Sequence, residues 1–261
     1  YDPTIGAGIK ALMRPNTAVV FVESPGSLTM EVQDVPAIAA IAHEAGAIVM
    51  GDNTWGTPLY YDAFALGMDI SISSATKYVS GHYDIVMGVI ACNKNHYGKL
   101  LHTWQHMGAS VSPDSAYLAH RGLRTMAVRL EKHQQNALQL ADWLKSRPEV
   151  EEVLYPALPG APGHDLWKRD FTGACGLFTI ALKERYSHAA LSAMLDHMEL
   201  FGMGYSWGGY ESLITPVNLK HVRTATTSRY QGTLLRIHVG LEHIDDIRAD
   251  LESGLMRLRN A

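Results

Sequence analysis

Short apolar runs alternate with helical patterns along the first third of this 261-residue chain. The apolar runs 19–22 and 47–50 predict two short buried strands, and residues 70–75 are a third strand candidate. Between the first two, Asp34 is placed to cap a helix that continues through Ala45, with Pro36 in its first turn and Gly46 at its end. Strands that alternate with helices indicate a mostly parallel sheet, and ligands of such sheets bind beyond the carboxyl ends of the strands.

The rest of the chain predicts a long helix and then a mixed region. Good helix formers fill residues 115–145, and Arg147-Pro148 ends that run. A helix of this length would bridge two domains with a boundary near Leu123, namely a large domain over 1–123 and a smaller α+β domain over 124–261. In the second domain the pattern predicts a turn-rich loop over 156–163, strands over 177–182 and 234–239, and helices over 187–197 and 245–258.

Composition and charge narrow the class of protein. Hydrophobic residues make up 47% of the chain, which is ample for cores. The formal net charge is −4, and the sequence contains no block of basic residues that would attract nucleic acid. Apolar stretches such as 35–42 are interrupted by charged residues before they reach the length of a membrane span. The two cysteines, Cys92 and Cys175, form no disulfide framework and favour a reducing, cytoplasmic location.

An acid and a lysine follow neighbouring predicted strands. Asp52 comes after the second strand and Lys77 after the third. A lone loop lysine is usually solvated, but this pair suits pyridoxal phosphate. Lys77 would hold the aldehyde of that cofactor, and the Asp52 carboxylate would keep the ring nitrogen protonated, which makes the ring an electron sink. The hydroxyls of Ser74 and Thr76 would bind its phosphate.

Several long motifs occur together in one order. They are Glu23-Ser24-Pro25-Gly26-Ser27, Asp52-Asn53-Thr54-Trp55, Ser74-Ala75-Thr76-Lys77-Tyr78 and Tyr205-Ser206-Trp207-Gly208-Gly209-Tyr210-Glu211-Ser212, with residues 121–125 and 167–173 in addition. With these motifs the sequence resembles the Cys/Met-metabolism family of pyridoxal-phosphate (PLP) enzymes over essentially its whole length, and the β-eliminating lyases most closely. The resemblance implies fold type I, with a mostly parallel large domain and a smaller C-terminal α+β domain.

The resemblance also implies a role for each site residue. Lys77 becomes the catalytic Schiff-base lysine, Asp52 the partner of the pyridine nitrogen, and Ser74 and Thr76 the phosphate ligands. Arg236 matches the arginine that binds the substrate α-carboxylate, a role that suits a planar guanidinium because it can clamp a carboxylate with two hydrogen bonds. Along the substrate lie Tyr205, Ser206 and Trp207, the last two beside the same carboxylate.

The implied reaction is β-elimination of L-cystathionine to homocysteine, pyruvate and ammonia, a step of transsulfuration and methionine biosynthesis. Elimination or replacement at Cγ is the alternative within the family. The family also implies a homotetramer. Because the chain begins at Tyr1, within what resembles the large domain, we expect part of the cofactor site to lie upstream: a glycine-containing phosphate cradle, a ring-stacking tyrosine and residues that reach a neighbouring subunit.

Three other hypotheses compete with this one. Gly204-Tyr205-Ser206-Trp207-Gly208 has the G-x-S-x-G spacing of a hydrolase nucleophile elbow, which requires a strand before the serine and a helix after it. The following sequence is a poor helix start, although Glu211 with His238 or His243 keeps a triad formally possible. A non-catalytic remnant of a PLP enzyme is the second alternative, and a yellow colour bleached by borohydride would exclude it.

The third hypothesis is a metal or dinucleotide site. His102 and His106 have the i, i+4 spacing of zinc ligands, but Thr103 stands where the metalloprotease motif needs glutamate and no third ligand is near. Gly6-Ala7-Gly8 follows no recognisable strand and lacks the third glycine of a dinucleotide fingerprint. We therefore predict no bound metal and no dinucleotide.

Overall fold

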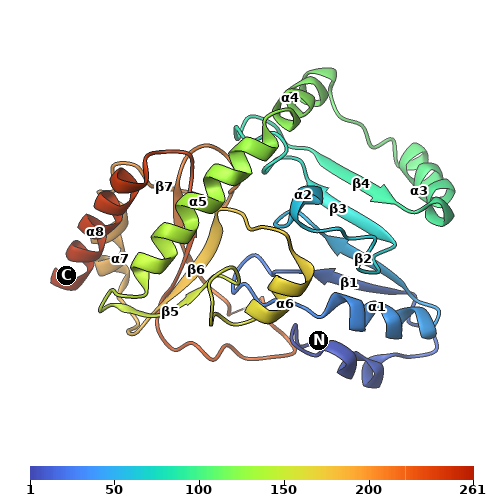
Figure 1. The fold of residues 1–261 in the computed structure, drawn as a ribbon, viewed down its shortest axis with the longest axis horizontal. Coiled ribbons are helices and arrows are strands. Elements are labelled where there is room, and N and C mark those ends of the chain that lie inside the picture. The colour runs from blue at the N-terminus through green and yellow to red at the C-terminus, as the bar shows by residue number, and fades with distance from the viewer. Residues whose placement is uncertain (221) are drawn as a thin grey trace.

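The computed structural model describes residues 1–220 and 222–261, and its first sheet has four strands. Their order is β1 (Val19–Glu23), β2 (Ile48–Asp52), β3 (Ile70–Ser74) and β4 (Gly88–Cys92) (Figure 1). The first three strands run parallel and β4 is antiparallel to β3. The predicted strands and their mostly parallel arrangement are confirmed, whereas β4 was not predicted.

Helix α1 (Val35–Glu44) connects β1 to β2 as the sequence predicts. The Asp34 side chain accepts a hydrogen bond from the Ala37 N–H at 3.4 Å, Pro36 lies in the first turn, and Gly46 follows with a φ of 77°. The helix buries one apolar face, which includes Ile38 and Ala42. Two short elements flank this unit, the 3₁₀ helix η1 (Gly6–Leu12) before β1 and α2 (Thr57–Tyr60) after β2.

The predicted continuous helix over 115–145 is wrong, because two helices form there. They are α4 (Pro113–Leu123) and α5 (Met126–Leu144), and a further helix, α3 (Lys94–Met107), precedes them. At the break the Gly122 carbonyl accepts hydrogen bonds from the Thr125 N–H (3.1 Å) and from Arg129 Nη2 (2.8 Å). Arg129 also donates to the Tyr78 carbonyl at 2.8 Å, which ties the start of α5 to the segment after β3.

The second sheet holds five strands in the order β5-β6-β9-β8-β7. Their bounds are β5 (Val150–Leu154), β6 (Leu177–Leu182), β7 (Gly202–Met203), β8 (Leu213–Val217) and β9 (Leu234–His238). The pairs are antiparallel except for β7 and β8. The remaining helices are α6 (His164–Asp170), α7 (His188–Leu195) and α8 (Ile244–Asn260), and α7 packs against α8.

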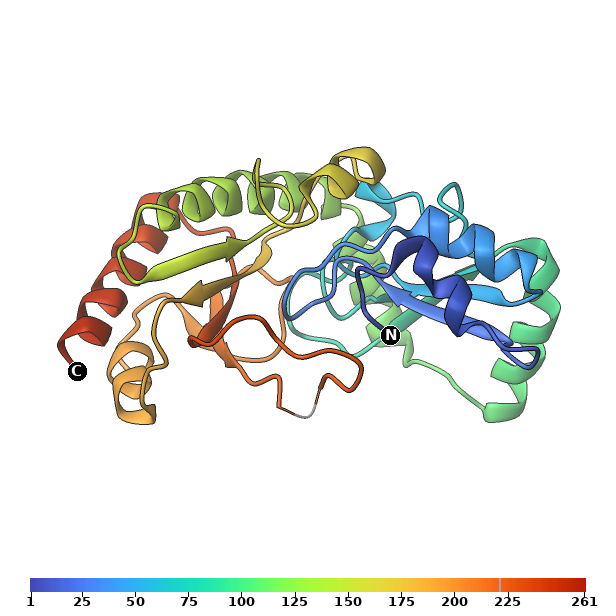
Figure 2. The same ribbon diagram turned by 90° about the horizontal axis from the view of Figure 1, so that it is seen from below.

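The two sheets share one hydrophobic core. Trp55, just after β2, donates from its indole nitrogen to the Leu177 carbonyl in β6 at 3.0 Å, and α5 runs from α4 beside the first sheet to β5 in the second (Figures 1 and 2). The domain boundary near Leu123 stays a prediction. Within the described residues, each helix is too short or too polar to cross a bilayer.

Candidate active site

Lys77 lies in the tight turn that follows β3. Its backbone N–H donates to the Ser74 carbonyl at 3.0 Å, and its carbonyl accepts from the Gly81 N–H at 2.8 Å. The side chain is half-buried, and Nζ donates to Ser206 Oγ at 2.8 Å. Burial, and then the nearby Arg236 charge, lower the pKa of Lys77. The structure thus shows a lysine with an increased neutral fraction, which is the form that acts as nucleophile and base.

Asp52 is the last residue of β2 and pairs in register with Glu23, the last residue of β1. Asp52 Oδ1 accepts a hydrogen bond from the Thr54 N–H at 2.8 Å. Glu23 Oε1 accepts one from the Ser27 N–H at 3.1 Å. Burial raises the pKa of Glu23, and the Asp52 charge adds to that increase. Two carboxyl groups therefore meet at the carboxyl edge of the sheet, close to the turn that carries Lys77.

The two predicted phosphate ligands lie in the same turn but have different surroundings. The Ser74 N–H donates to Thr54 Oγ at 2.8 Å, which ties the end of β3 to the segment after β2. Thr76 Oγ accepts from the Met87 N–H at 3.0 Å and lies 3.3 Å from the Met87 carbonyl, to which it donates. In this structure the Thr76 hydroxyl therefore holds the chain that leads into β4. The phosphate role of both residues stays a prediction.

Arg236 comes from β9 in the second sheet and is 6% exposed. Its Nη2 donates to the Tyr205 carbonyl at 2.6 Å, and its Nη1 donates to the Ser27 carbonyl at 3.4 Å. The guanidinium carbon lies 5.7 Å from the centre of the Tyr205 ring. Burial lowers the pKa of Arg236. A guanidinium has five N–H donors, so donors beyond these two bonds are left for a ligand.

The structure brings Lys77 together with a segment far away in the sequence. Ser206 accepts from the lysine amine, and the buried Trp207 ring has its centre 5.5 Å from Nζ. Tyr205 contributes its carbonyl to Arg236, while its side chain is 71% exposed. Asp52 lies beside Glu23, its register partner in β1. Burial raises the pKa of Glu23, the Asp52 charge raises it further, and the Arg236 charge lowers it. The predicted site residues thus gather between the two sheets.

Sequence reasoning missed three contributors. Glu23 was noted only as part of a motif, although its position at a strand end next to Asp52 was a usable signal. Thr54 bonds to Ser74 across two strand ends, which the sequence does not reveal. His238 was considered only as a possible triad member, although it lies two residues from Arg236 on β9 and therefore on the same face of that strand, a periodicity that could have identified it as a neighbour of the site.

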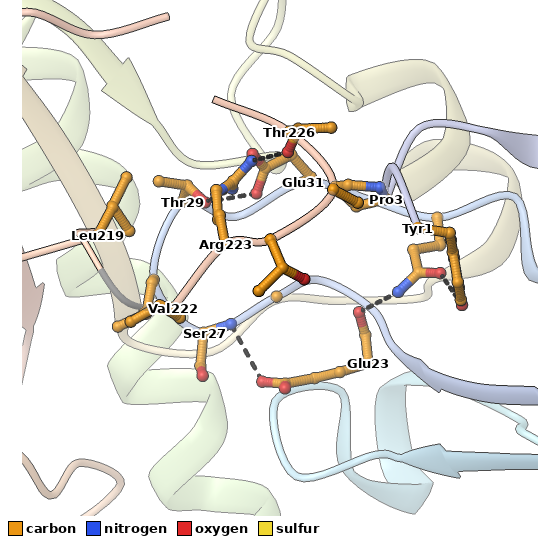
Figure 3. Close-up of a pocket in the computed structure, with 15 residues that line it drawn as sticks. Tyr1, Pro3, Glu23, Ser27, Thr29, Glu31, Leu219, Val222, Arg223 and Thr226 are labelled. Carbon is orange, nitrogen blue, oxygen red and sulfur yellow. Dashed lines mark hydrogen bonds and ion pairs between the residues drawn. The ribbon is translucent and has the colours of Figure 1, made fainter. Parts of the chain in front are cut away.

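A cavity of about 480 Å³ adjoins the Arg236 end of the site. Figure 3 shows Glu23 and Ser27 in one wall and Arg223 opposite them. The Arg223 guanidinium pairs with Glu31 and hydrogen-bonds to Thr29, which closes that side of the cavity. Ser27 connects this cavity to Arg236, because its carbonyl accepts a hydrogen bond from Arg236 Nη1 at 3.4 Å.

The structure contradicts the nucleophile-elbow hypothesis. Ser206 lies in the loop between β7 and β8, and no helix follows it within residues 207–217. Its hydroxyl accepts from Lys77, while the His238 ring contacts the backbone of Gly208 and Gly209.

The histidines His102 and His106 lie on α3 with their rings stacked 3.8 Å apart, and the His106 Nδ1 contacts the His102 carbonyl at 2.7 Å. In the part of the chain that the structure describes, no group of three or more His, Cys, Asp and Glu side chains is arranged to hold a metal ion.

The donor set fits PLP. It offers an amine with a lowered pKa for the aldehyde, a strand-end carboxylate for the ring nitrogen, and a buried guanidinium for an anionic group. A mostly parallel sheet whose carboxyl edge presents a carboxylate and a half-buried lysine is the arrangement expected of an α/β enzyme that binds this cofactor.

Comparisons with known proteins agree with this class. The family described as "Cys/Met metabolism PLP-dependent enzyme" matches residues 1–256, and the chain belongs to this family. The predicted family, the fold class, the cofactor and the expectation of a PLP-dependent enzyme are therefore confirmed.

Three similar proteins illustrate the relationship. Cystathionine beta-lyase MetC of Escherichia coli is 47% identical over 99% of this chain and 67% of its own length. A putative cystathionine beta-lyase of Rhizobium johnstonii is 48% identical over 97% of this chain and 65% of its own length. The crystal structure of a cystathionine gamma synthase from Xanthomonas oryzae matches with a TM-score of 0.85 and 31% identity, over 93% of this chain and 64% of that one. The chain thus spans about two thirds of the length of the proteins it matches.

Proposed function

We propose that the whole protein is a PLP-dependent lyase that cleaves L-cystathionine by β-elimination to homocysteine, pyruvate and ammonia. The observation that carries the proposal is the half-buried Lys77 amine, hydrogen-bonded to Ser206 Oγ at 2.8 Å and next to the buried Arg236. The names of the two curated relatives, both cystathionine β-lyases, support elimination at Cβ. The likeness to a γ-synthase supports the alternative, reaction at Cγ with the same cofactor.

Four residues of this chain would divide the work. PLP, when bound, supplies an electron sink for negative charge that develops at the substrate Cα. Asp52 would hold the protonated ring nitrogen, and Arg236 would bind the substrate α-carboxylate with the donors that Tyr205 and Ser27 leave free. Lys77, whose lowered pKa increases its neutral fraction, would take the Cα proton. Ser206 would keep the amine directed to that position.

The overall reaction balances without a further reactant except water. The Cβ–S bond breaks, its electron pair leaves on sulfur, and a proton converts the thiolate to homocysteine. The remaining three-carbon amino fragment takes up one water and is released as pyruvate and ammonia.

The cavity beside Arg236 supports a substrate with a long second arm. It has a volume of about 480 Å³ and carries the polar groups Glu23, Glu31 and Arg223 in its walls. Cystathionine carries an ammonium and a carboxylate at the end distant from the reacting carbon. We place that arm in this cavity.

We further propose that the enzyme is a cytoplasmic homotetramer that acts in methionine biosynthesis. Large apolar side chains that are exposed on α3, α4 and α5, among them Met107 (75%), Tyr117 (66%) and Val128 (66%), support contacts between subunits. The free thiols of Cys92 and Cys175 support a reducing compartment. Light scattering of the purified enzyme tests the assembly, and fractionation of cells tests the location.

Lys77→Ala tests the central assignment. We expect turnover of cystathionine to fall at least about 10³-fold, because both the cofactor linkage and the base are lost, while the melting temperature stays close to that of the wild type. Lys77→Arg should fail equally, because a guanidinium stays protonated. Reduction of the wild type with borohydride should attach the cofactor to the peptide that contains Lys77. Wild-type activity in a pure Lys77→Ala preparation would contradict the assignment.

A product assay separates the two reaction types. We expect pyruvate and homocysteine from cystathionine, whereas elimination at Cγ yields 2-oxobutyrate and cysteine. The second pair as the main products would overturn the β-lyase proposal and leave the cofactor assignment intact.

A further inference from the structure

Two side chains of β9 hold the two ends of the segment that contains Ser206 and Trp207. Arg236 donates to the Tyr205 carbonyl at 2.6 Å, before Ser206. His238 Nε2 lies 3.2 Å from the Gly208 nitrogen and 3.0 Å from the Gly209 carbonyl, just after Trp207. Residues two apart on a strand point to the same face. One strand therefore contacts both ends of the five-residue segment 205–209.

This segment rests directly on the backbone of Lys77. Gly208 adopts a φ of 86°, and a Cβ atom added to it would lie 2.9 Å from Lys77 C, from Lys77 Cβ and from the Tyr78 nitrogen. Real Cβ atoms do not approach backbone that closely, so only glycine allows the contact. A shift of the Gly208–Gly209 turn would consequently move Ser206 relative to the lysine amine, to which it is bonded at 2.8 Å.

His238 is 1% exposed, and its only hydrogen-bond contacts within the described residues are those two backbone groups. Its ring packs between Tyr78 (6.0 Å between ring centres) and His133 (5.1 Å). A neutral imidazole either accepts from the Gly208 N–H or donates to the Gly209 carbonyl through this nitrogen. An apolar residue of similar size would fill the space but would leave the backbone group that bonds to this nitrogen without that partner.

The His238 ring is uncharged at neutral pH when it contacts the Gly208–Gly209 turn. Burial lowers the pKa of His238 well below the ordinary value, and the nearby Lys77 and Arg236 charges act in the same direction. His133 is also neutral, because burial lowers its pKa to about 4. The role of His238 is therefore to hold the backbone, and it donates no proton to the substrate.

We propose that His238 is a positioning residue, which fixes the Gly208–Gly209 turn and thereby sets Ser206 Oγ at hydrogen-bonding distance from Lys77 Nζ. The proposal rests on the proposed function of Lys77. It assigns to β9 two tasks, to present Arg236 to the substrate and to hold the segment that directs the catalytic amine.

Three variants of the full-length enzyme test this role. His238→Phe removes the hydrogen bond of Nε2 to the Gly208–Gly209 turn at similar volume, and His238→Gln restores a side chain that can donate and accept. His133→Phe is the matched control, since it replaces an equally buried imidazole of the same cluster whose hydrogen bond goes to the Val239 carbonyl and not to the Gly208–Gly209 turn. After the cofactor is removed, the pH dependence with which acetic anhydride labels Lys77, followed by peptide mass spectrometry, reports the pKa of the amine. Kinetics with cystathionine are measured on the loaded enzymes.

In His238→Phe we expect the labelling midpoint of Lys77 to rise toward that of an ordinary lysine, because the released segment lets water reach the amine. Its kcat should fall at least tenfold with a smaller change in KM. His238→Gln should recover both values to within about threefold, and His133→Phe should leave the labelling midpoint unchanged even if it lowers the melting temperature.

Two outcomes would overturn the positioning role: a wild-type labelling midpoint in His238→Phe, or an equal rise in His133→Phe. If borohydride does not attach the cofactor to Lys77 in the wild type, the proposed function fails instead.

Discussion

Arg236 combines structural and electrostatic contacts with a proposed contact to the substrate. Its guanidinium is assigned to the substrate α-carboxylate, yet it already holds the Tyr205 carbonyl at 2.6 Å. It also lowers the pKa of Lys77. A substitution at this position would therefore remove the proposed substrate contact and also the hydrogen bond that holds the Tyr205 carbonyl.

We predict that Arg236→Ala reduces kcat/KM for cystathionine by an amount equivalent to about 2 to 4 kcal/mol, since a bidentate, charge-assisted contact is lost. Arg236→Lys should recover little of it, because an ammonium cannot form two parallel hydrogen bonds. The visible absorbance of the bound cofactor should survive in both variants. Arg229→Ala, which removes an exposed arginine paired with Glu152, is the control and should keep wild-type kinetics. Loss of the absorbance in both Arg236 variants would place this residue in the cofactor site.

At the scale of elements, the turn that contains Gly208 packs closely against the turn that contains Lys77, so we expect a side chain at position 208 to disturb both. Gly208→Ala should lower kcat more than tenfold and reduce the free energy of unfolding by about 1 to 3 kcal/mol, through both the positive φ and the collision with Lys77. Gly46→Ala is the matched control, because Gly46 has a φ of 77° and open space around its Cβ position. It should cost about 1 kcal/mol and leave kcat unchanged. Equal kcat values for the two variants would show that Gly208 serves only the backbone conformation.

The packing of α5 against β9 predicts how stability depends on pH. His133 on α5 donates from Nδ1 to the Val239 carbonyl at 2.7 Å, and burial lowers its pKa from 6.5 to about 4. As the pH falls from 6.5 to about 4, the unfolded chain binds a proton at this residue and the folded protein does not, so stability decreases through this window. Over the whole window, protonation of His133 in the unfolded chain lowers the free energy of unfolding by about 3 kcal/mol.

In His133→Gln the free energy of unfolding should therefore decrease less as the pH falls over that range. Urea denaturation at a series of pH values measures this dependence. The decrease contributed by His238, whose pKa is lowered in the same direction, should remain. An unchanged pH dependence in His133→Gln would mean that this histidine does not account for the acid sensitivity.

For the whole molecule, Trp55 is the clearest connection between the sheets. It is 3% exposed, donates to the Leu177 carbonyl of β6 at 3.0 Å, and meets Phe171 edge-to-face at 5.7 Å. Trp55→Phe should reduce the free energy of unfolding by about 2 to 4 kcal/mol, since both volume and a buried hydrogen bond are lost. Trp104→Phe on the exposed face of α3 should change it by less than about 0.5 kcal/mol. Similar urea midpoints for the two variants would contradict the connecting role.

The sequence by itself determined the parallel part of the fold and named the residues that are proposed for the site. Apolar runs of four to six residues, the Asp34 cap and Gly46 are local signals. They are sufficient for β1, α1 and β2, and they place Asp52 and Lys77 at the carboxyl edge of one sheet. The family resemblance then supplied a role for Arg236 and for Ser74, Thr76 and residues 205–207, which the structure leaves as predictions.

Only the tertiary structure decided how the two halves of the site meet. The Lys77–Ser206 bond joins residues 129 positions apart, and the His238 contact depends on the register of β9 beside a loop from another strand. The helix over 115–145 breaks at 124–125, where the Thr125 N–H bonds to the Gly122 carbonyl, and Arg129 ties this junction to the Tyr78 carbonyl, 51 positions earlier in the sequence. Local propensity reports what a segment can form alone, whereas these features arise from contacts between segments that the chain brings together only when it folds.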